Sequence, residues 1–455
     1  MRAEHRRPRL CCLAACLSGV FGAPLATVTA ANTLNVSSCA DDNSAGTLRK
    51  VVAAAANGDT VDLHTQLPFA CSTITLQHGE IPVTVANLSL QGPSNHALTI
   101  EAGDSSRVLN HSGTGHLQID HLTLADGKYL SASGDAKGGC VFSNGSVYLT
   151  EARLTGCFAT SKAASGYAEG GAVFAGFVSL DHSEVVANFA RAYNNSTALG
   201  GGIAAFGGVV VTSSTISSNA AIPVGNAADA KGGGIWNHGP ITLAASTLDG
   251  NQASEGGAIF HYGLGLLSGD VTISNSTVSG NRAVSAAGIY NATPIFTTLP
   301  PPGFEKSTLT LNNSTVAFNT ATSSFSGVFT RTDYVQVNSS ILARNTRSNA
   351  PFDDLAIDGT ANSLSGAANL IQTTDLPLPD SLTADPRLAP LADHGGGVRT
   401  HALLATSPAV DAGSNTTNLI SDQRGAGFAR VVGGADIGAY ERQIADDEIY
   451  YGGFE

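Results

Sequence analysis

The chain has 455 residues, of which 52 are glycine, 13% are charged, and only one each is Met and Trp. This composition is unlike that of an ordinary helical enzyme, although the chain is long enough to bury a large core. A net charge of -13 argues against nucleic acid as a partner, because binding it depends on cations that face phosphates.

The N-terminal 30 residues have the features of a secretory signal peptide. Basic residues precede an apolar stretch over residues 10–20, and the short side chains at 28–30 suit cleavage by a signal peptidase. The apolar stretch is shorter than the ~20 residues that a membrane-spanning helix needs. We therefore expect export, with the mature chain secreted or on the outer cell surface and without a transmembrane segment.

Four cysteines remain beyond the expected signal peptide. An even number in an exported chain favours two disulfides, and no CxxC spacing points to a metal or redox site. Four cysteines allow three pairings, among which we predict Cys39–Cys71 and Cys140–Cys157.

Seven segments of the chain repeat one pattern of apolar and small residues. Apolar residues occupy the positions three, eight and ten before each segment's last residue, and serine lies five before it in six of the seven segments. A second apolar position follows a Gly or Ala pair in most of them. The seven segments end at Cys157, Asn188, Asn219, Asn251, Asn281, Asn319 and Asn345.

This repeat predicts an all-β, right-handed parallel β-helix. The apolar positions eight and ten back have the spacing of a strand with one buried face, and one such repeat cannot close a core alone. Stacked copies bury their apolar residues against one another, with strands paired ~4.8 Å apart. We interpret the terminal Asn column as a structural turn ladder, because Asn tolerates left-handed turns and its amide can bond the next amide.

The remaining sequence suggests caps around the repeats. "SAGTLRKVVAAAANGDTVDL" places Leu48, Val51, Val52 and Ala55 on one face of a short capping helix. The expected organisation is a signal peptide, a cap with irregular coils, regular repeats, C-terminal coils with a closing segment, and a tail, at residues 1–30, 31–115, 116–350, 351–441 and 442–455.

Several motifs carry a resemblance to known families. "GGAIF" and "STVSGN" resemble the repeats of polymorphic outer membrane proteins and related bacterial β-helix exoproteins. "GTLRKVVAAAANGDTVDL" and "DQRGAGFARVVGGADIGAYE" resemble the choice-of-anchor Q family. The resemblance implies a secreted or surface-attached β-helix whose anchor varies between members. The tail "DDEIYYGGFE" is similar to short tails ending in Gly-Phe-Glu on other exported bacterial proteins.

One set of charged residues is a candidate catalytic site. Coil stacking places Arg153 beside Glu184 and Glu151 beside His182, with Asp181 next to them. Polysaccharide lyases of this fold use a similar set, in which carboxylates bind Ca²⁺ and a basic residue removes a proton. Glu151, Asp181 and Glu184 would then be metal ligands, with Arg153 or His182 catalytic; the alternative is a solvated surface ion pair.

Two weaker candidates concern polysaccharides as well. Asp353-Asp354 and His394 superficially resemble pieces of a polygalacturonase site, although they lie in the irregular region. Aromatic residues follow the second strand position in five coils and could form an external stack for sugar rings, or pack under another part of the chain. These aromatic residues are Phe142, Phe174, Trp236, Phe260 and Tyr290.

The sequence therefore predicts an exported, non-catalytic β-helix for adhesion or glycan binding, with a polysaccharide or cell-surface glycan as its partner and no cofactor. A Ca²⁺-dependent pectate-type lyase and a structural surface spacer are the alternatives, since a fold alone does not determine function.

Overall fold

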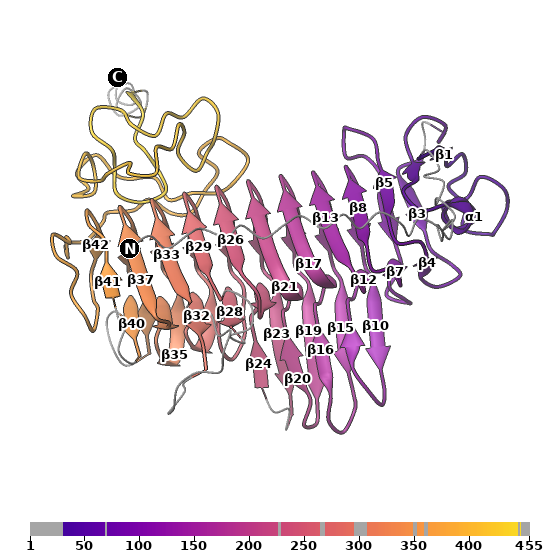
Figure 1. Cartoon of the computed structure of the whole chain (residues 1–455), viewed down its shortest axis with the longest axis horizontal. Coiled ribbons are helices and arrows are strands. Elements are labelled where there is room, and N and C mark those ends of the chain that lie inside the picture. The colour runs from indigo at the N-terminus through magenta and orange to yellow at the C-terminus, as the bar shows by residue number, and fades with distance from the viewer. Residues whose placement is uncertain are drawn as a thin grey trace, which may run out of the picture.

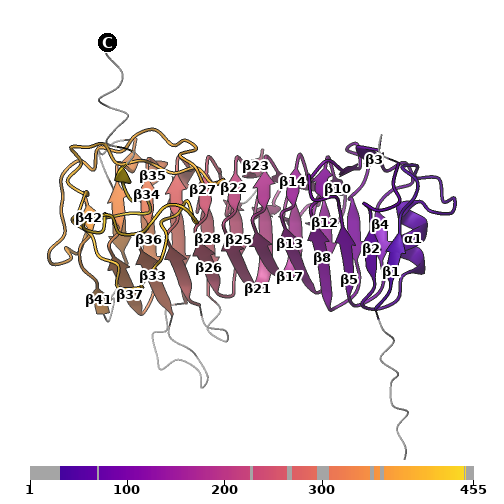
Figure 2. The ribbon, with the colours of Figure 1, turned by 90° about the horizontal axis from the view of Figure 1, so that it is seen from above.

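The computed structural model is a parallel β-helix, seen from the side in Figure 1 and from above in Figure 2. It describes residues 31–68, 71–225, 229–263, 269–294, 307–348, 353–358, 363–444 and 446, so the expected signal peptide and most of the expected tail lie outside the described residues. The predicted fold, an all-β parallel solenoid with a short N-terminal helix, is confirmed. The one helix in the described part of the chain has 7 residues and is too short to cross a membrane.

Three parallel ladders of strands run along the solenoid, and a typical coil adds one strand to each. The first ladder contains β4 Ile81–Val83, β7 Leu109–His111, β12 Val141–Ser143, β17 Val173–Asp181, β21 Ile203–Thr212, β25 Ile235–Asn237, β28 Ile259–Tyr262, β32 Ile289–Ala292, β36 Val328–Arg331 and β40 Leu355–Ile357. The second contains β1 Thr33–Asn35, β2 Thr60–Asp62, β5 Leu88–Gln91, β8 His116–Asp120, β13 Ser146–Thr150, the ends of β17 and β21, β26 Ile241–Ala244, β29 Val271–Ser274, β33 Thr308–Asn312, β37 Tyr334–Asn338 and β41 Ser363–Ser365.

The third ladder forms a separate sheet of 11 strands. These are β3 Thr73–Thr75, β6 Thr99–Glu101, β9 Thr123–Ala125, β14 Arg153–Thr155, β18 Glu184–Val186, β22 Thr215–Ser217, β27 Thr247–Asp249, β30 Thr277–Ser279, β34 Thr315–Ala317, β38 Ile341–Ala343 and β42 Leu370–Ile371. The sequence columns are register columns: Val147 pairs with Val178, and Leu154 pairs with Val185. These side chains are buried, so each coil covers the apolar residues of its neighbours.

The terminal Asn residues form the predicted turn ladder at the corner after the third ladder. The side-chain amide of Asn251 donates to Oδ1 of Asn281 at 3.0 Å, and the amide of Asn281 donates to Oδ1 of Asn319 at 2.8 Å. The backbone N–H of each ladder residue also donates to the Oδ1 atom of the Asn one coil on, from Cys157 onto Asn188 at the start to Asn319 onto Asn345 near the end. The ladder ends on a carboxylate, because Asn345 donates to Oδ1 of Asp354 at 2.8 Å.

The serine that recurs at the same position of successive coils forms a second ladder at the corner before the third-ladder strands. The Ser246 hydroxyl accepts a hydrogen bond from the backbone of Ser214, and the Ser276 hydroxyl accepts one from the backbone of Ser246. Each of these hydroxyls donates to the carbonyl two residues before it, as Ser246 does to Ala244. Buried corner amides thus find partners that the strands do not supply.

The N-terminal cap is the helix α1, Leu48–Ala54. Leu48 and Val52 are buried, and Val51 and Ala55 pack against the same core, so the predicted apolar face covers the first coils. Both predicted disulfides are present. Cys39–Cys71 lies in the cap, and Cys140–Cys157 ties the start of a first-ladder strand to the start of the Asn ladder.

Four coils extend beyond the solenoid as a flat projection, which we call the fin and which lies at the bottom of Figure 1. Its outgoing strands are β10 Lys128–Ser131, β15 Phe158–Ser161, β19 Phe189–Tyr193 and β23 Ala220–Val224, and its returning strands are β11 Ala136–Lys137, β16 Tyr167–Glu169, β20 Thr197–Leu199 and β24 Asp229–Lys231. The two layers meet through small side chains, including Ala168, Ala190 and Ala198. A shorter ladder of β31 Arg282–Ser285, β35 Thr320–Ser324 and β39 Thr346–Arg347 follows in later coils.

After β42 the chain turns back along the solenoid instead of continuing its axis (Figures 1 and 2). This returning segment, residues 373–444, is called the lobe. Its contacts lie on the outer face of the third ladder: the Thr247 hydroxyl donates to the Arg399 carbonyl at 2.7 Å, and Thr277 donates to Gln423 at 2.5 Å. The lobe therefore covers the coils from β27 onward on that face.

Candidate functional site

The five aromatic residues that were candidates for an external stack line up along the first ladder. The rings of Phe142 and Phe174 stack at 5.7 Å between centroids, and those of Phe260 and Tyr290 stack at 4.6 Å. Phe174 and Phe260 are 8% and 4% exposed and Trp236 is 5% exposed. Leu199 of the fin strand β20 belongs to their cluster, and Lys137 and Lys231 of the returning fin strands lie over the Phe174 and Phe260 rings. The burial matches the alternative interpretation, in which these rings pack under another part of the chain.

Stacking brings Arg153 and Glu184 together as expected. The two residues are register partners, and they form an ion pair in which each side chain is 45% exposed. They line a pocket of about 300 Å³ at the edge of the lobe, opposite Asp393 and Arg399. An exposed pair of this kind is typically worth less than about 1 kcal/mol.

The other charged candidates contact different partners. The Glu151 carboxylate lies 3.3 Å from the side chains of both His96 and His121, and Asp181 accepts from Nδ1 of His182 at 2.9 Å. Among the residues that the structure describes, no group of three or more His, Cys, Asp or Glu side chains is arranged to hold a metal ion. A Ca²⁺ site at Glu151, Asp181 and Glu184 stays a prediction.

Asp353, Asp354 and His394 are not brought together by a strand motif. Asp354 terminates the Asn ladder, where it accepts hydrogen bonds from the backbone and side chain of both Asn345 and Thr373. Burial raises the pKa of Asp354 to about 6, against the lowering effect of these donors. His394 lies in the lobe, so Asp354 has a structural role at the end of the ladder.

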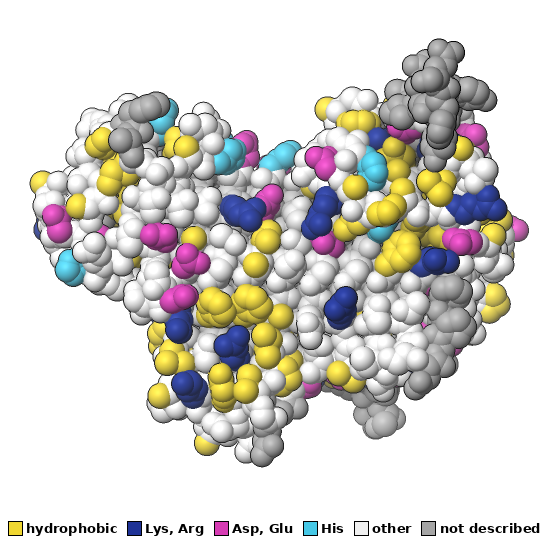
Figure 3. Space-filling model, turned by 180° about the vertical axis from the view of Figure 1, so that it is seen from behind, with side chains coloured by type: hydrophobic (Ala, Val, Ile, Leu, Met, Phe, Trp, Pro, Cys, Tyr) yellow, Lys and Arg dark blue, Asp and Glu magenta, His cyan; other side chains and the backbone are white. Residues whose placement is uncertain are grey.

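The strongest candidate surface is the outer face of the fin. Residues alternate along β19, with Ala190 and Ala192 buried against the inner layer and the larger side chains of Phe189, Arg191 and Tyr193 half-buried on the outer side. Seen from behind, hydrophobic side chains gather around Lys and Arg side chains on the fin (Figure 3). We call this surface the fin face; it comprises Lys128, Leu130, Phe158, Thr160, Lys162, Phe189, Arg191, Tyr193, Ile222 and Val224.

Rings and cations alternate on the fin face. Phe158 and Phe189 are register partners whose rings stack at 5.1 Å and 15°. The Arg191 guanidinium lies 5.9 Å from the Phe158 ring centre, and the Lys162 ammonium lies 5.8 Å from the Tyr193 ring centre. Both distances are within the reach of a cation–π attraction. The fin face therefore presents aromatic rings together with positive charges that lie close to those rings.

The cations of the fin face lack carboxylate partners. In the described parts of the chain, Lys128, Lys162 and Arg191 form no ion pair. By contrast, Lys137 and Lys231 in the returning layer each pair with a glutamate at 3.2 Å. The fin face is therefore locally cationic on a chain whose net charge is -13.

A hollow adjoins the first strand of the fin face. It has a volume of about 510 Å³ and is bordered by Lys128, Tyr129 and Leu130 on one side and by Glu80 and Arg107 on the other. The Arg107 guanidinium lies 3.4 Å from the Tyr129 ring centre and 2.8 Å from the Glu80 carboxylate. Lys128 and Leu130 therefore belong both to the fin face and to the border of the hollow.

The sequence contained one signal for the fin face that the repeat analysis does not use. Phe158 and Phe189 directly follow Cys157 and Asn188, so they occupy one further column, 31 residues apart. That column changes to Ala220 in the next coil, and no periodicity shows that the segments beyond it leave the solenoid. Which column faces solvent depends on the path of the fin.

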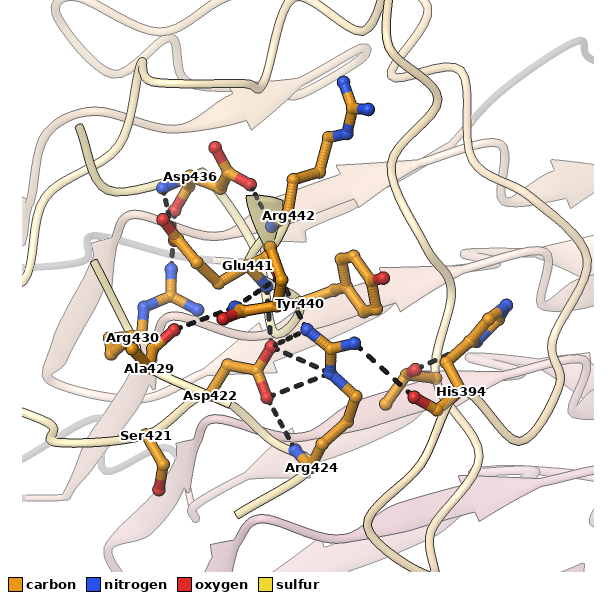
Figure 4. A network of polar contacts seen from close by, with 12 residues as sticks. His394, Ser421, Asp422, Arg424, Ala429, Arg430, Asp436, Tyr440, Glu441 and Arg442 are labelled. Carbon is orange, nitrogen blue, oxygen red and sulfur yellow. Dashed lines mark hydrogen bonds and ion pairs between the residues drawn. The ribbon is translucent and has the colours of Figure 1, made fainter. Parts of the chain in front are cut away.

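The lobe holds a network of buried charges (Figure 4). Arg424 donates to the Asp422 carboxylate at 2.7 Å and to the Glu441 carbonyl at 2.6 Å, and its guanidinium lies 3.8 Å from the Tyr440 ring centre. Burial raises the pKa of Glu441 to about 7, although it accepts backbone hydrogen bonds and lies near Arg430. These residues belong to "DQRGAGFARVVGGADIGAYE", so this motif holds the lobe in shape.

We expect the lobe to weaken on acidification because of His401. This residue joins the lobe to the solenoid: Nε2 lies 2.8 Å from the Ser279 hydroxyl and Nδ1 lies 2.7 Å from the Ala389 carbonyl. Burial lowers the pKa of His401 to about 4. Since the folded pKa is below the unfolded value of about 6.5, its stabilisation is present above pH 6.5 and is lost as the pH falls toward 4.

The full loss corresponds to about 3 kcal/mol of unfolding free energy. Urea unfolding of the parent chain and of His401→Gln at pH 7, 5.5 and 4 measures this. The stability gap between the two proteins should shrink as the pH falls, and subtracting the two curves removes the titration of other groups. A gap that stays constant with pH would contradict the assignment.

Comparisons with known proteins identify no family for this chain. No family model and no curated protein matches the chain. A similar solved structure is described as "Crystal structure of pectate lyase Pel9A", with 11% sequence identity, 92% coverage of this chain, 98% coverage of that chain and a TM-score of 0.37. A likeness at this level supports no statement about activity.

Proposed function

We propose that this protein is an exported or cell-surface β-helix that binds acidic polysaccharide without cleaving it, and that the fin face is its binding surface. The observation that supports this proposal is the group of cations without carboxylate partners between the half-buried rings of the fin sheet. Ring faces suit the apolar faces of sugar rings, and the cations suit carboxylates or sulfates. A neutral glycan would leave the cations without a partner.

Two further observations support the export part of the proposal. The chain carries two disulfides, which persist mainly in oxidising compartments outside the cytosol. The resemblance of the quoted motifs to choice-of-anchor Q and polymorphic outer membrane proteins also favours a secreted or surface-attached protein. The signal peptide at residues 1–30 belongs to the same proposal.

The test measures binding to polygalacturonate and alginate, with dextran as a neutral comparison, by affinity electrophoresis. We expect Arg191→Ala and Phe189→Ala each to weaken binding to the acidic polymers roughly tenfold, since a desolvated cation–π or stacking contact is worth up to ~2 kcal/mol. Binding should also weaken in 1 M salt, where the Debye length is about 3 Å.

The matched control is Arg282→Ala. Arg282 is exposed, lies in the same column as Phe158 and Phe189, and sits outside the fin on β31. The Arg282→Ala substitution removes one positive charge, as Arg191→Ala does. If it weakened polysaccharide binding as much as Arg191→Ala, the attraction would be non-specific and the proposal would be overturned.

The same samples distinguish the alternatives. A Ca²⁺-dependent rise in ultraviolet absorbance from unsaturated uronates, lost in Arg153→Ala, would make the protein a lyase. If the protein neither bound nor cleaved any acidic polymer, the result would favour the alternative function as a structural surface spacer.

A further inference from the structure

A pocket of about 580 Å³ lies between the lobe and the corner of the third ladder. The solenoid supplies residues at the ends of β27 and β30 and directly after β34 and β38. The lobe supplies Asp385, Arg387, Leu388, Pro390, Leu391 and His401. The pocket is separate from the fin face, because no residue of the fin lines it. It is large enough for a sugar-sized ligand, since small-molecule sites occupy ~300–1,000 Å³.

The walls of the pocket are largely apolar. Phe318 from the solenoid faces Leu388, Pro390 and Leu391 from the lobe. The Phe318 ring lies 5.0 Å from the ring of His401, which is buried and held by its own hydrogen bonds. A flat apolar ring against rigid neighbours suits a ligand with a ring-shaped body.

Of the two arginines among the residues that line the pocket, Arg344 has a carboxylate partner and Arg387 does not. Arg399 holds both oxygens of Asp249 at 2.7 Å, and Arg344 pairs with Asp385 at 3.2 Å. The Arg387 side chain has no ion pair or side-chain hydrogen bond to any residue that the structure describes. An arginine at the mouth of an apolar pocket is suited to a carboxylate, which it can bind through two hydrogen bonds.

The residue column at this corner supports the same assignment. In each coil the residue before the ladder position has a left-handed backbone, with φ between 57° and 68°. In five successive coils this residue is small, namely Gly156, Ala187, Ser218, Gly250 and Gly280, of which the last two line the pocket. In the next two coils the position holds Phe318 at φ 58° and Arg344 at φ 61°. Large side chains replace small ones at a position that favours glycine, and both line the pocket.

We propose that this pocket binds a ring-shaped carboxylate, namely a uronate unit such as a chain end. Arg387 binds the carboxylate and Phe318 stacks on the sugar ring. The choice of a sugar acid rests on the proposed function, whereas the pocket and its cation do not.

The test is isothermal titration of the full chain with galacturonate and with galactose. Galacturonate should bind measurably, and galactose should bind at least about tenfold more weakly because it offers Arg387 no charge. Arg387→Gln should weaken galacturonate binding by about tenfold. Phe318→Gly should weaken it as well, and the preference of glycine for the left-handed backbone should offset part of the stability lost with the ring contact to His401.

Two controls separate this proposal from the fin face. Arg282→Gln removes an exposed arginine outside the pocket and should leave galacturonate binding unchanged. Arg191→Ala should weaken polymer binding and spare the monomer, so either proposal can fail alone. Failure of galacturonate to bind, or equal affinity in Arg387→Gln and the parent chain, would overturn the pocket assignment.

Discussion

Replacement of Asn281 by alanine should destabilise the solenoid by about 4 kcal/mol. The Asn281 amide donates to the Leu248 carbonyl at 3.0 Å and to Asn319 at 2.8 Å, while its oxygen accepts from both the backbone and the side chain of Asn251. Alanine leaves these groups buried without partners, and an unmade buried hydrogen bond costs ~1–3 kcal/mol each. Guanidinium unfolding followed by circular dichroism measures the loss.

Asn144→Ala is the matched control for this variant. Asn144 is exposed and makes one side-chain hydrogen bond, to the Ser112 carbonyl at 3.0 Å. Its loss should change the unfolding free energy by no more than about 0.5 kcal/mol, as for most surface substitutions. Equal losses in the two variants would mean that the Asn ladder does not stabilise the coils beyond ordinary surface contacts.

Arg424→Met should release the lobe from the solenoid and cost about 4 kcal/mol. The Arg424 and Asp422 side chains are 2% and 0% exposed, so methionine leaves a buried carboxylate without its cation. Removal of one partner from a buried pair typically costs ~3–5 kcal/mol. Limited proteolysis should then cut residues 373–444 faster than in the parent chain, because the lobe opens more often.

A second substitution tests whether the charge is the cause. Asp422→Asn in the Arg424→Met background removes the unpaired carboxylate and should recover part of the protease resistance. Arg282→Met changes an exposed arginine and should have no effect on either measurement. A lobe that stays resistant in Arg424→Met would show that its surface contacts with β27, β30 and β34 are sufficient.

The regular part of the fold was predictable because it depends on short-range periodicity. Val147, Val178 and Val209 occupy one column, and the structure pairs them in register. Asn251 and Asn281 were predicted as a ladder for the same reason, since a repeated residue in a stacked coil meets its own copy. The pairing of Arg153 with Glu184 followed from the same stacking.

The candidate binding surfaces were harder to predict because they depend on segments that leave the coil. Phe174 and Trp236 were candidates for an outward stack, with packing under another part of the chain as the alternative, and they lie in one register column of the first ladder. The fin then covers them and presents Phe158 and Phe189 instead. The 580 Å³ pocket requires residues 249 and 387 to meet, and no local pattern relates two residues so far apart.

The sequence by itself determined the coil, its three buried columns, the Asn ladder and the capping helix. Each of these follows from residues that interact with neighbours one repeat away or less than one repeat apart. Only the tertiary structure decided the direction of the lobe, the path of the fin and the exposure of each ring. These features depend on which surfaces meet after the coils have stacked. The repeated residues interact only with the adjacent coils, so their pattern does not indicate where the fin and the lobe pack.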